Sequence, residues 1–458
     1  MTSNRLAELR STHQGQIRQA GDEGYDEVRA GWNLTVEHHP EVVAVPENAE
    51  DVAASVRFAA AEGMPIAVHR TGHGSGAPAE GGLLINTRAL RELSIDPNAR
   101  TARIGAGLTW ADVVPAAAEH ELAPLCGSSD HVGVMGYLTG GGLPVLGRTF
   151  GFAVNHVREL DLVTADGTLR TLSPTADPEL FWAVRGGKGN FGVVTAATID
   201  LVPQARLHGG SLTFAGADAE RVLRTYFAWV TEQPDEMSSS AILVRYPDFP
   251  QVPEAIRGKF SLNIRIAFTG SEEDGARLTE PLRALGPEED TVGEMPYTRI
   301  AEIYQDPTHA TPANVRTALL SEFDDEAIAA YLAAVGPGVK LPFGGVELRH
   351  LGGALSRPPM APSAVGRVSA QFHLFMSNPA PADKAAPVRA EQQRVLDALK
   401  RWDTGALLPG FLFGQDADPA VVRRAYTEAD YEQLTVLKAK HDPLNLFRHN
   451  HNIPPRQA

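Results

Sequence analysis

Cysteine is nearly absent from this chain of 458 residues, which contains only Cys126. A single cysteine excludes an intrachain disulfide and any metal site built from several thiolates. We expect Cys126 to be a small buried hydrophobic residue. One unpaired cysteine is typical of a reducing compartment, so a cytoplasmic location is expected.

Long apolar runs and excess positive charge are also missing. The N-terminus lacks the apolar core of a signal peptide, and no stretch could span a bilayer. The chain has 41 Lys and Arg against 56 Asp and Glu, which gives a formal net charge of −15. Such a balance argues against nucleic acid or an anionic membrane as a partner. The length predicts two or three globular domains.

Glycine, in contrast, is concentrated in three clusters. The first is the turn AVHRTGHGSGAP (67–78), which ends a predicted strand–helix–strand unit over residues 41–70, with Asn48 and Gly63 at the two ends of the helix. The second, residues 127–151, holds eight glycines, and the third lies within residues 177–203. Such turns let backbone amides approach an anion closely. Together they predict a large phosphate-bearing ligand.

Two common nucleotide-binding motifs are missing. No GxxxxGK[ST] sequence is present, which argues against a nucleoside triphosphate loop. No GxGxxG follows the first predicted strand with an acidic residue at the expected distance, which weakens an NAD-linked dehydrogenase. The ligand is therefore expected to be a different dinucleotide.

The pattern changes from about residue 206. Residues 260–270, 344–355 and 366–377 alternate in polarity like strands, with helical segments between them. This predicts an antiparallel sheet with helices on one face. Near the C-terminus, a helix ends at Asp442-Pro443 and an extended, docked segment follows. We expect an α+β fold in three parts, residues 1–205, 206–405 and 406–458.

Four motifs in order are VHRTGHG, HVGVMGYLTGGG, LFWAVRGGKGNFGVVT and HDPLNLFRHNHNIPP. Through them the chain resembles the vanillyl-alcohol-oxidase superfamily with a PCMH-type FAD-binding domain, specifically its berberine-bridge-enzyme-like branch. The resemblance covers residues 25–205 and 405–455. It implies an FAD-binding domain formed by both ends of the chain, with a central α+β substrate domain between them.

The resemblance also assigns cofactor contacts. His73 aligns with the histidine that relatives often bond to the flavin; an ordinary loop histidine is the alternative. Where bicovalent relatives carry a second, cysteine tether, this chain has Ser129, so attachment through His73 alone is expected. The HNHN run (449–452) could suggest metal, but flavin contacts are favoured and no metal site is expected. The FAD contacts implied are Arg70, Thr71, Gly72, His73, Gly74, Ser128, Ser129, His131, Val132, Gly133, Gly136, Tyr137, Gly140, Gly141, Gly142, Gly189, Gly192, Val194, Asn450 and Asn452.

Candidates for catalysis lie mainly on two predicted strands. Glu347 and Arg349 share one strand face, and Gln371 and His373 share a face of another. The resemblance places these strands over the flavin ring, where the side chains could act as a base or bind substrate. A buried Glu–Arg ion pair is the structural alternative. Tyr137 is a further candidate, either beside the flavin or purely structural.

The resemblance implies a small-molecule oxidation with two readings left open. Val132, beside the expected flavin, leaves room for O2 and favours an oxidase acting on an alcohol, sugar or polycyclic natural product in bacterial secondary metabolism. The usual Tyr-x-Asn motif is missing, because Pro409 and Phe411 stand at its positions. A flavin-binding protein without a base is therefore the alternative. We expect a monomer or homodimer.

Overall fold

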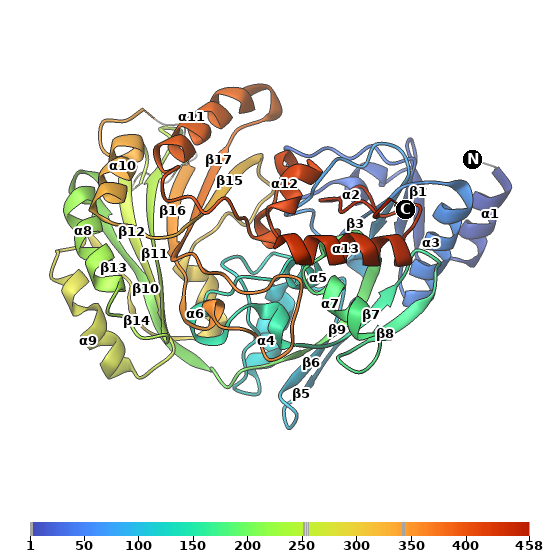
Figure 1. Ribbon diagram of the computed structural model, residues 1–458, viewed down its shortest axis with the longest axis horizontal. Helices are drawn as coiled ribbons and strands as arrows, with labels where there is room; N and C mark the ends of the chain where they lie inside the picture. Colours follow the sequence, from blue (N-terminus) through green and yellow to red (C-terminus); the bar gives the residue numbers. More distant parts are fainter. Residues whose placement is uncertain (1–2, 251, 253, 255, 341–343, 458) are drawn as a thin grey trace.

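Three β-sheets organise the computed structural model, which describes residues 3–250, 252, 254, 256–340 and 344–457 (Figure 1). The first sheet has the order β1 (Gln16–Gln19), β2 (Val42–Val45), β4 (Leu83–Asn86), β3 (Ile66–His69). β2 and β3 both pair in parallel with β4. This sheet carries the first glycine turn directly after β3.

The helix between β2 and β3 forms as the sequence predicts. α3 (Ala49–Glu62) begins after Asn48, whose side chain accepts a hydrogen bond from the Asp51 N–H, and ends at Gly63 with φ 66°. Val52, Val56 and other apolar residues on one face are buried. The strand–helix–strand unit over residues 41–70 is thus confirmed.

The second sheet is antiparallel, in the order β5 (Leu93–Asp96), β6 (Thr101–Gly105), β9 (Val193–Asp200), β7 (Val157–Val163), β8 (Leu169–Leu172). β7 and β8 form a hairpin through Asp166 and Gly167. The Asp166 carboxylate accepts from Thr164 Oγ1 and the Thr168 N–H, and Gly167 has φ 73°. Further helices within residues 1–205 and 406–458 are α1 (Ser3–Thr12), α2 (Tyr25–Arg29), α4 (Trp110–Ala118), α5 (Val134–Thr139), α6 (Gly147–Phe150), α7 (Pro178–Val184) and α12 (Pro419–Arg423).

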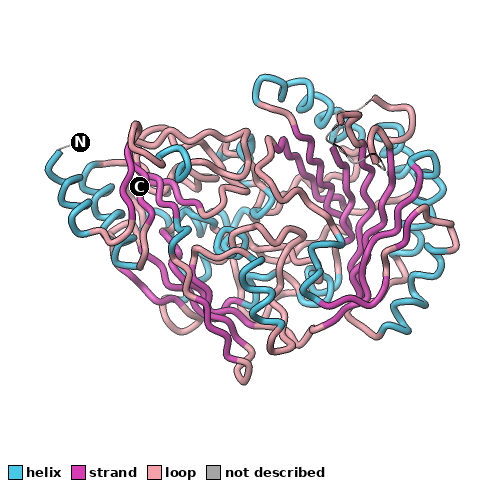
Figure 2. The backbone as a smooth tube through the Cα atoms, turned by 180° about the vertical axis from the view of Figure 1, so that it is seen from behind, coloured by secondary structure: helices cyan, strands magenta, loops and turns pink. Residues whose placement is uncertain are grey.

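The third sheet is the large antiparallel sheet expected in the middle of the chain. Its strands are β10 (Arg206–Ala215), β11 (Met237–Arg245), β12 (Phe260–Phe268), β13 (Glu289–Asp290), β14 (Gly293–Pro296), β15 (Ala313–Leu320), β16 (Gly344–His350) and β17 (Phe372–Pro379). Helices α8 (Ala219–Val230), α9 (Glu272–Arg283), α10 (Asp325–Val335) and α11 (Ala385–Ala398) lie on its outer side, as Figures 1 and 2 show. The opposite face of this sheet is turned toward the terminal parts of the chain.

Both ends of the chain share one hydrophobic core. This core joins Val56 and Ile85 near the N-terminus to Phe447 and Ile453 near the C-terminus. A second core lies within residues 212–402. α13 (Glu428–His441) ends at Asp442, as the sequence predicts. The α+β fold, with an FAD-binding-type domain and a central domain, is confirmed; the boundaries 1–205, 206–405 and 406–458 stay predictions.

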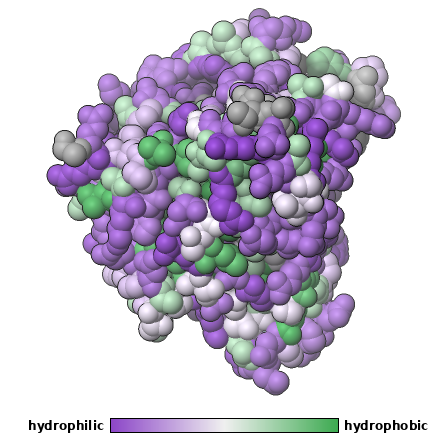
Figure 3. All heavy atoms as spheres, turned by 90° about the vertical axis from the view of Figure 1, so that its right-hand side faces the viewer, coloured by the Kyte–Doolittle hydropathy of each residue, from purple (hydrophilic) through white to green (hydrophobic). Residues whose placement is uncertain are grey.

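The outer surface near the termini is mainly hydrophilic, with apolar residues scattered over it (Figure 3). Within the described residues, every helix is too short or too polar to cross a bilayer.

Candidate active site

A cavity of about 740 Å³ is lined by both the glycine turns and the central sheet. This volume lies within the usual range for a small-molecule site, about 300–1,000 Å³. Most of the residues singled out in the sequence line it. They are Arg70, Thr71, Gly72, His73, Gly74, Ser128, Ser129, Val132, Gly133, Gly136, Tyr137, Gly142, Gly189, Gly192, Val194, Glu347, Arg349 and Asn450.

Two runs of backbone amides beside this cavity have no acceptors in the described chain; all of residues 71–77 line it, as do five of residues 127–133. None of the N–H groups of residues 71–77 or 127–133 donates a hydrogen bond to the described part of the chain. Buried amides are almost always hydrogen-bonded in folded proteins. Successive free N–H groups form a concave site for an anion. These turns therefore fit the pyrophosphate of a dinucleotide.

Arg70 and Lys188 line the cavity as cations without a carboxylate within 4 Å among the described residues. Arg70 Nε donates to Gly107 O at 2.6 Å, and burial lowers its pKa. Lys188 Nζ donates to His451 Nδ1 at 2.9 Å, and burial lowers the pKa of Lys188 to about 7. An anionic ligand would neutralise both. Sequence reasoning identified Arg70 but missed Lys188, whose contact with His451 joins distant segments.

Close backbone packing fixes the first turn. Gly72 has φ 66°, and a Cβ there would meet the Cα of Gly31 at 2.6 Å. The Trp32 N–H donates to Thr71 O at 2.7 Å, so residues 31–33 run beside the turn. Only glycine meets both demands at position 72. The turn is therefore preformed and holds His73 at the cavity wall.

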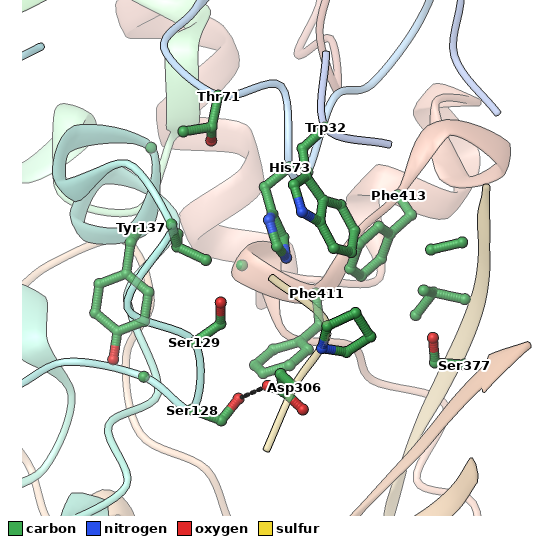
Figure 4. Close-up of a pocket in the computed structure, with 18 of the residues that line it drawn as sticks. Trp32, Thr71, His73, Ser128, Ser129, Tyr137, Asp306, Ser377, Phe411 and Phe413 are labelled. Carbon is green, nitrogen blue, oxygen red and sulfur yellow. Dashed lines mark hydrogen bonds between the residues drawn. The ribbon is translucent and has the colours of Figure 1, made fainter. Parts of the chain in front are cut away.

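His73 stacks on Trp32, with ring centroids 3.9 Å apart and an interplanar angle of 21° (Figure 4). Neither ring nitrogen of His73 has a hydrogen-bond partner in the described part of the chain. Burial lowers the pKa of His73 to about 4, against the opposing charge of Asp306. The imidazole is therefore neutral at pH 7 and keeps a free lone pair. Sequence reasoning missed Trp32, which no motif marks.

Tyr137 is held at the opposite end of the same wall by small neighbours. A Cβ on Gly142 would meet its ring at 2.4 Å, and one on Gly127 would meet it at 3.0 Å. Its ring packs edge-on against Trp110, with centroids 5.4 Å apart. The hydroxyl is buried without a partner in the described residues, and burial raises the pKa of Tyr137 well above 10. It can therefore donate a hydrogen bond to a bound group.

The one cysteine lies behind the cavity wall. Cys126 is 1% exposed and its Sγ lies 3.4 Å from the Tyr297 hydroxyl. Burial raises the pKa of the Cys126 thiol to about 11, partly offset by this hydrogen bond. Ser129, not Cys126, faces the cavity. The buried role expected for Cys126 is confirmed.

Glu347 and Arg349 form the ion pair that was the structural alternative, and they also line the cavity. Arg349 Nε donates to Glu347 Oε2 at 2.8 Å, and Arg265 Nη1 to Oε1 at 3.0 Å. Ser240 Oγ adds a hydrogen bond of 2.7 Å. Burial alone would raise the pKa of Glu347, but the two arginines and Ser240 outweigh it and lower the pKa to about 2. Glu347 is therefore a fixed anion.

Arg349 has N–H donors that are not used in its pair with Glu347. Its guanidinium carbon lies 5.1 Å from the ring centres of Tyr304 and Phe375 and 5.6 Å from that of Phe411. Its two terminal nitrogens make no hydrogen bond within the described residues. Arg349 can therefore bind an oxygen acceptor in the cavity.

Asp306 is a second cavity carboxylate, which sequence reasoning missed. It accepts a hydrogen bond of 2.6 Å from Ser128 Oγ (Figure 4). It comes from a loop with no motif, so only the folded chain reveals it. Trp32, Phe411 and Phe413 form an aromatic wall of the cavity, and the part of the cavity beside them is called the aromatic chamber.

Two strand residues are not where the sequence predicted them. Gln371 is exposed and precedes β17, which begins only at Phe372. The predicted strand over 366–377 is therefore wrong in its first half, and Gln371 does not line the cavity. His373 is fully buried behind the wall, 4.4 Å from the Phe411 ring, and burial lowers its pKa to about 3.

Four predicted cofactor contacts lie just outside the cavity wall. Gly140 packs on Gly410, and Gly141 packs on Val365. His131 Nε2 lies 3.3 Å from the Asp130 carboxylate. Asn452 is half-buried, and its Oδ1 has no partner among the described residues. These residues support the turns rather than line the space they enclose.

Two family models match the sequence. One, described as an FAD binding domain, matches residues 40–173; the other, described as berberine and berberine like, matches residues 414–454. (R)-6-hydroxynicotine oxidase of Paenarthrobacter nicotinovorans is 31% identical over 465 residues, covering 96% of this chain and 97% of that protein. An FAD-linked oxidoreductase of Dictyostelium discoideum is 24% identical, covering 97% and 95%.

Solved structures show the same fold. The structure of 6-hydroxy-D-nicotine oxidase from Arthrobacter nicotinovorans matches with a TM-score of 0.84 and 25% identity, covering 97% of this chain and 99% of that one. Berberine bridge enzyme from Eschscholzia californica matches with a TM-score of 0.83 and 18% identity, covering 99% of both chains. The second likeness shows the fold alone.

Proposed function

Because the chain belongs to the berberine-bridge-enzyme-like family of FAD-linked oxidoreductases, we propose that it is an FAD-dependent oxidase with O2 as electron acceptor. Bound FAD supplies the oxidising power, since its ring takes a hydride from a substrate C–H bond and returns the electrons to oxygen. The free amides of residues 71–77 and 127–133 carry this proposal, because they offer a seat that nothing in the described chain fills.

His73 is the proposed covalent tether. Attachment needs a neutral imidazole with an available lone pair, and His73 has both. Its stacking on Trp32 limits its rotation. Ser129 stands where a second tether would need a thiol, and Cys126 is buried away from the cavity. A single attachment point is therefore proposed.

The substrate space lies beside Arg349, under the central sheet. It is lined by Tyr304, Phe375 and Phe411 together with the charged pair of Arg349 and Glu347. Aromatic walls with a few polar groups suit a ring-bearing alcohol, a sugar or a polycyclic natural product. A hydroxylated heterocyclic amine is a further candidate substrate, because one relative is named (R)-6-hydroxynicotine oxidase. We place the reaction in secondary metabolism as a tailoring step.

Peroxide formation tests this function. The purified protein should be yellow, with one FAD per chain, and should form hydrogen peroxide in air with at least one member of a panel of primary and benzylic alcohols, sugars, 6-hydroxynicotine and phenolic polycycles. Heat-denatured protein from the same preparation is the control. A folded protein that cannot be loaded with FAD would contradict the proposal.

A flavin-binding protein without turnover is the second candidate. Pro409 and Phe411 favour it, because neither can exchange a proton where relatives carry Tyr-x-Asn. This candidate predicts full FAD loading and no peroxide with the whole panel. Peroxide with any member rejects it.

A further inference from the structure

Asp306 lines the same cavity as His73 and Arg349. It belongs to the loop between the 3₁₀ helix Tyr297–Ile303 and β15. Burial lowers the pKa of His73, and the charge of Asp306 opposes that effect. Burial also lowers the pKa of Arg349, and the charges of Glu347, Tyr304 and Asp306 raise it. The charge of Asp306 therefore acts on both groups across the cavity that all three residues line.

The carboxylates of Glu347 and Asp306, which both line the cavity, differ in what they can still bind. Glu347 is fully buried and accepts hydrogen bonds from Ser240, Arg265 and Arg349. Asp306 is half-buried and accepts one, from Ser128 to Oδ2; its Oδ1 has no partner in the described part of the chain. Of these two carboxylates, only Asp306 has a free oxygen that could receive a proton.

Other groups of the chamber are unsuited to that task. Pro409 and Phe411 occupy the Tyr-x-Asn positions and carry no exchangeable side-chain proton. The Tyr137 hydroxyl stays protonated, because burial raises its pKa. His73 is assigned to the cofactor by its place in the first turn. Beside these aromatic residues, Asp306 is therefore the group with a free oxygen that can act as the base.

We propose that Asp306 is the general base of the oxidation and that Ser128 positions it. The proposal rests on the proposed function and specifies the substrate's reacting group, a carbon that bears both a C–H bond and an O–H or N–H group. Oδ1 takes the proton from oxygen or nitrogen, and a C=O or C=N bond forms. The C–H hydrogen leaves with its two electrons as hydride to the flavin, the oxidant. Arg349 binds the substrate oxygen through its free terminal nitrogens.

Anaerobic flavin reduction tests the base directly. With a panel substrate, Asp306→Asn should reduce its flavin about 10²- to 10⁴-fold more slowly than wild type, the usual range for loss of a general base. Flavin content and melting temperature should not change. Glu302→Gln is the matched control, because Glu302 is an exposed carboxylate four residues earlier that pairs with Arg299. A wild-type rate in Asp306→Asn overturns the proposal.

Chemical rescue separates a base from a structural carboxylate. Asp306→Gly should regain part of the reduction rate when formate is added, because formate can occupy the space and accept the proton. Ser128→Ala should slow reduction about tenfold, as expected for loss of a hydrogen bond to a charged group. No response of Asp306→Gly to formate up to molar concentration overturns the catalytic role.

Sulfite binding tests the position of Asp306 without any substrate. Sulfite adds to oxidised flavin as an anion, so a nearby carboxylate weakens its binding. Asp306→Asn should bind sulfite about tenfold more tightly than wild type, and Glu302→Gln should match wild type. Unchanged affinity in Asp306→Asn overturns the proposal. If no panel member reduces wild-type flavin, the proposed function fails, while the sulfite result still decides whether Asp306 faces the ring.

Discussion

At the scale of single residues, the polar side chains around the cavity fall into two groups. Glu347 and Arg265 have their hydrogen bonds satisfied within the protein. The second group is His73, Arg70 and Arg349. In the described chain His73 makes no side-chain hydrogen bond, and each arginine makes one through Nε and leaves its terminal nitrogens free. The first group holds the sheet together, and the second is available to a ligand.

His73 makes the sharpest residue-scale prediction. After denaturation and digestion of the wild-type protein, mass spectrometry should find a peptide containing residue 73 that is heavier by one FAD. His73→Ala should still bind FAD through the backbone amides but release all of it on denaturation. Ser129→Ala is the control and should keep the tether. Complete release of flavin from denatured wild type would show that His73 is only a contact residue.

Glu347 should stabilise the fold in a pH-dependent way. Its pKa is lowered from 4.5 to about 2, so its stabilisation is complete above about pH 4.5 and is lost as the pH falls toward 2. Glu347→Gln should lower the unfolding free energy at pH 7 by about 3–5 kcal/mol, since two buried arginines lose their counter-ion. Urea unfolding at pH 7 and pH 3 measures both effects. Glu294 provides the control. It is exposed and pairs with Arg206 at the surface, so Glu294→Gln should leave stability unchanged. Equal losses in the two variants would contradict the prediction.

Residue-level prediction from sequence succeeded where local rules decide and failed where the fold decides. Glu347 and Arg349 were placed on one strand face by the two-residue period of a strand. Gln371 was misplaced, because the alternating pattern begins at residue 366, before β17 itself begins at Phe372. Trp32 contacts Thr71 through the backbone and Asp306 contacts Ser128 through its side chain, and no local pattern encodes these contacts with distant segments.

At the scale of elements, a buried ion pair fixes α13 and the C-terminal segment to the third glycine cluster. Lys438 Nζ donates to Asp442 Oδ2 at 2.6 Å, Asn190 O at 2.7 Å and Phe447 O at 3.1 Å, and both charged side chains are fully buried. Asp442 in turn accepts from the N–H groups of Leu446 and Phe447. The network sets the path of the chain toward Asn450, at the cavity wall.

Breaking this network should loosen the cofactor seat from a distance. Lys438→Met leaves Asp442 without its buried counter-ion and should lower the unfolding free energy by about 3–5 kcal/mol. In a His73→Ala background it should also weaken FAD binding, measured by flavin fluorescence. Lys440→Met is the matched control, because Lys440 lies on the same helix but pairs with Glu179 at the surface. Equal FAD affinity in the two variants would rule out the coupling.

Helices and hairpins whose ends are marked by capping or turn residues were predicted correctly from the sequence. The Asn48 and Gly63 caps of α3, the Asp166-Gly167 hairpin and the stop of α13 at Asp442 all follow from local chemistry. The order of strands in the central sheet was not predictable, because β11 pairs with β16 across about a hundred residues. Register over that separation depends on the whole domain.

At the scale of the whole molecule, the two ends of the chain build one side of the cavity and the central sheet builds the other. His73 and Asn450 come from the terminal parts, and Asp306 and Arg349 come from the middle. A ligand between them contacts both parts at once. Changes in the central domain can therefore alter the substrate without disturbing the cofactor seat.

The central claim is that a flavin in this cavity is reduced by a substrate that lies under the central sheet. Its most direct measurement is a single turnover in an anaerobic cuvette, in which the FAD-loaded protein is mixed with each member of the substrate panel. We predict that at least one compound bleaches the flavin with uptake of two electrons per chain, and that admitting air restores the colour with one peroxide per flavin. Fully loaded protein that stays oxidised with every compound would contradict the claim.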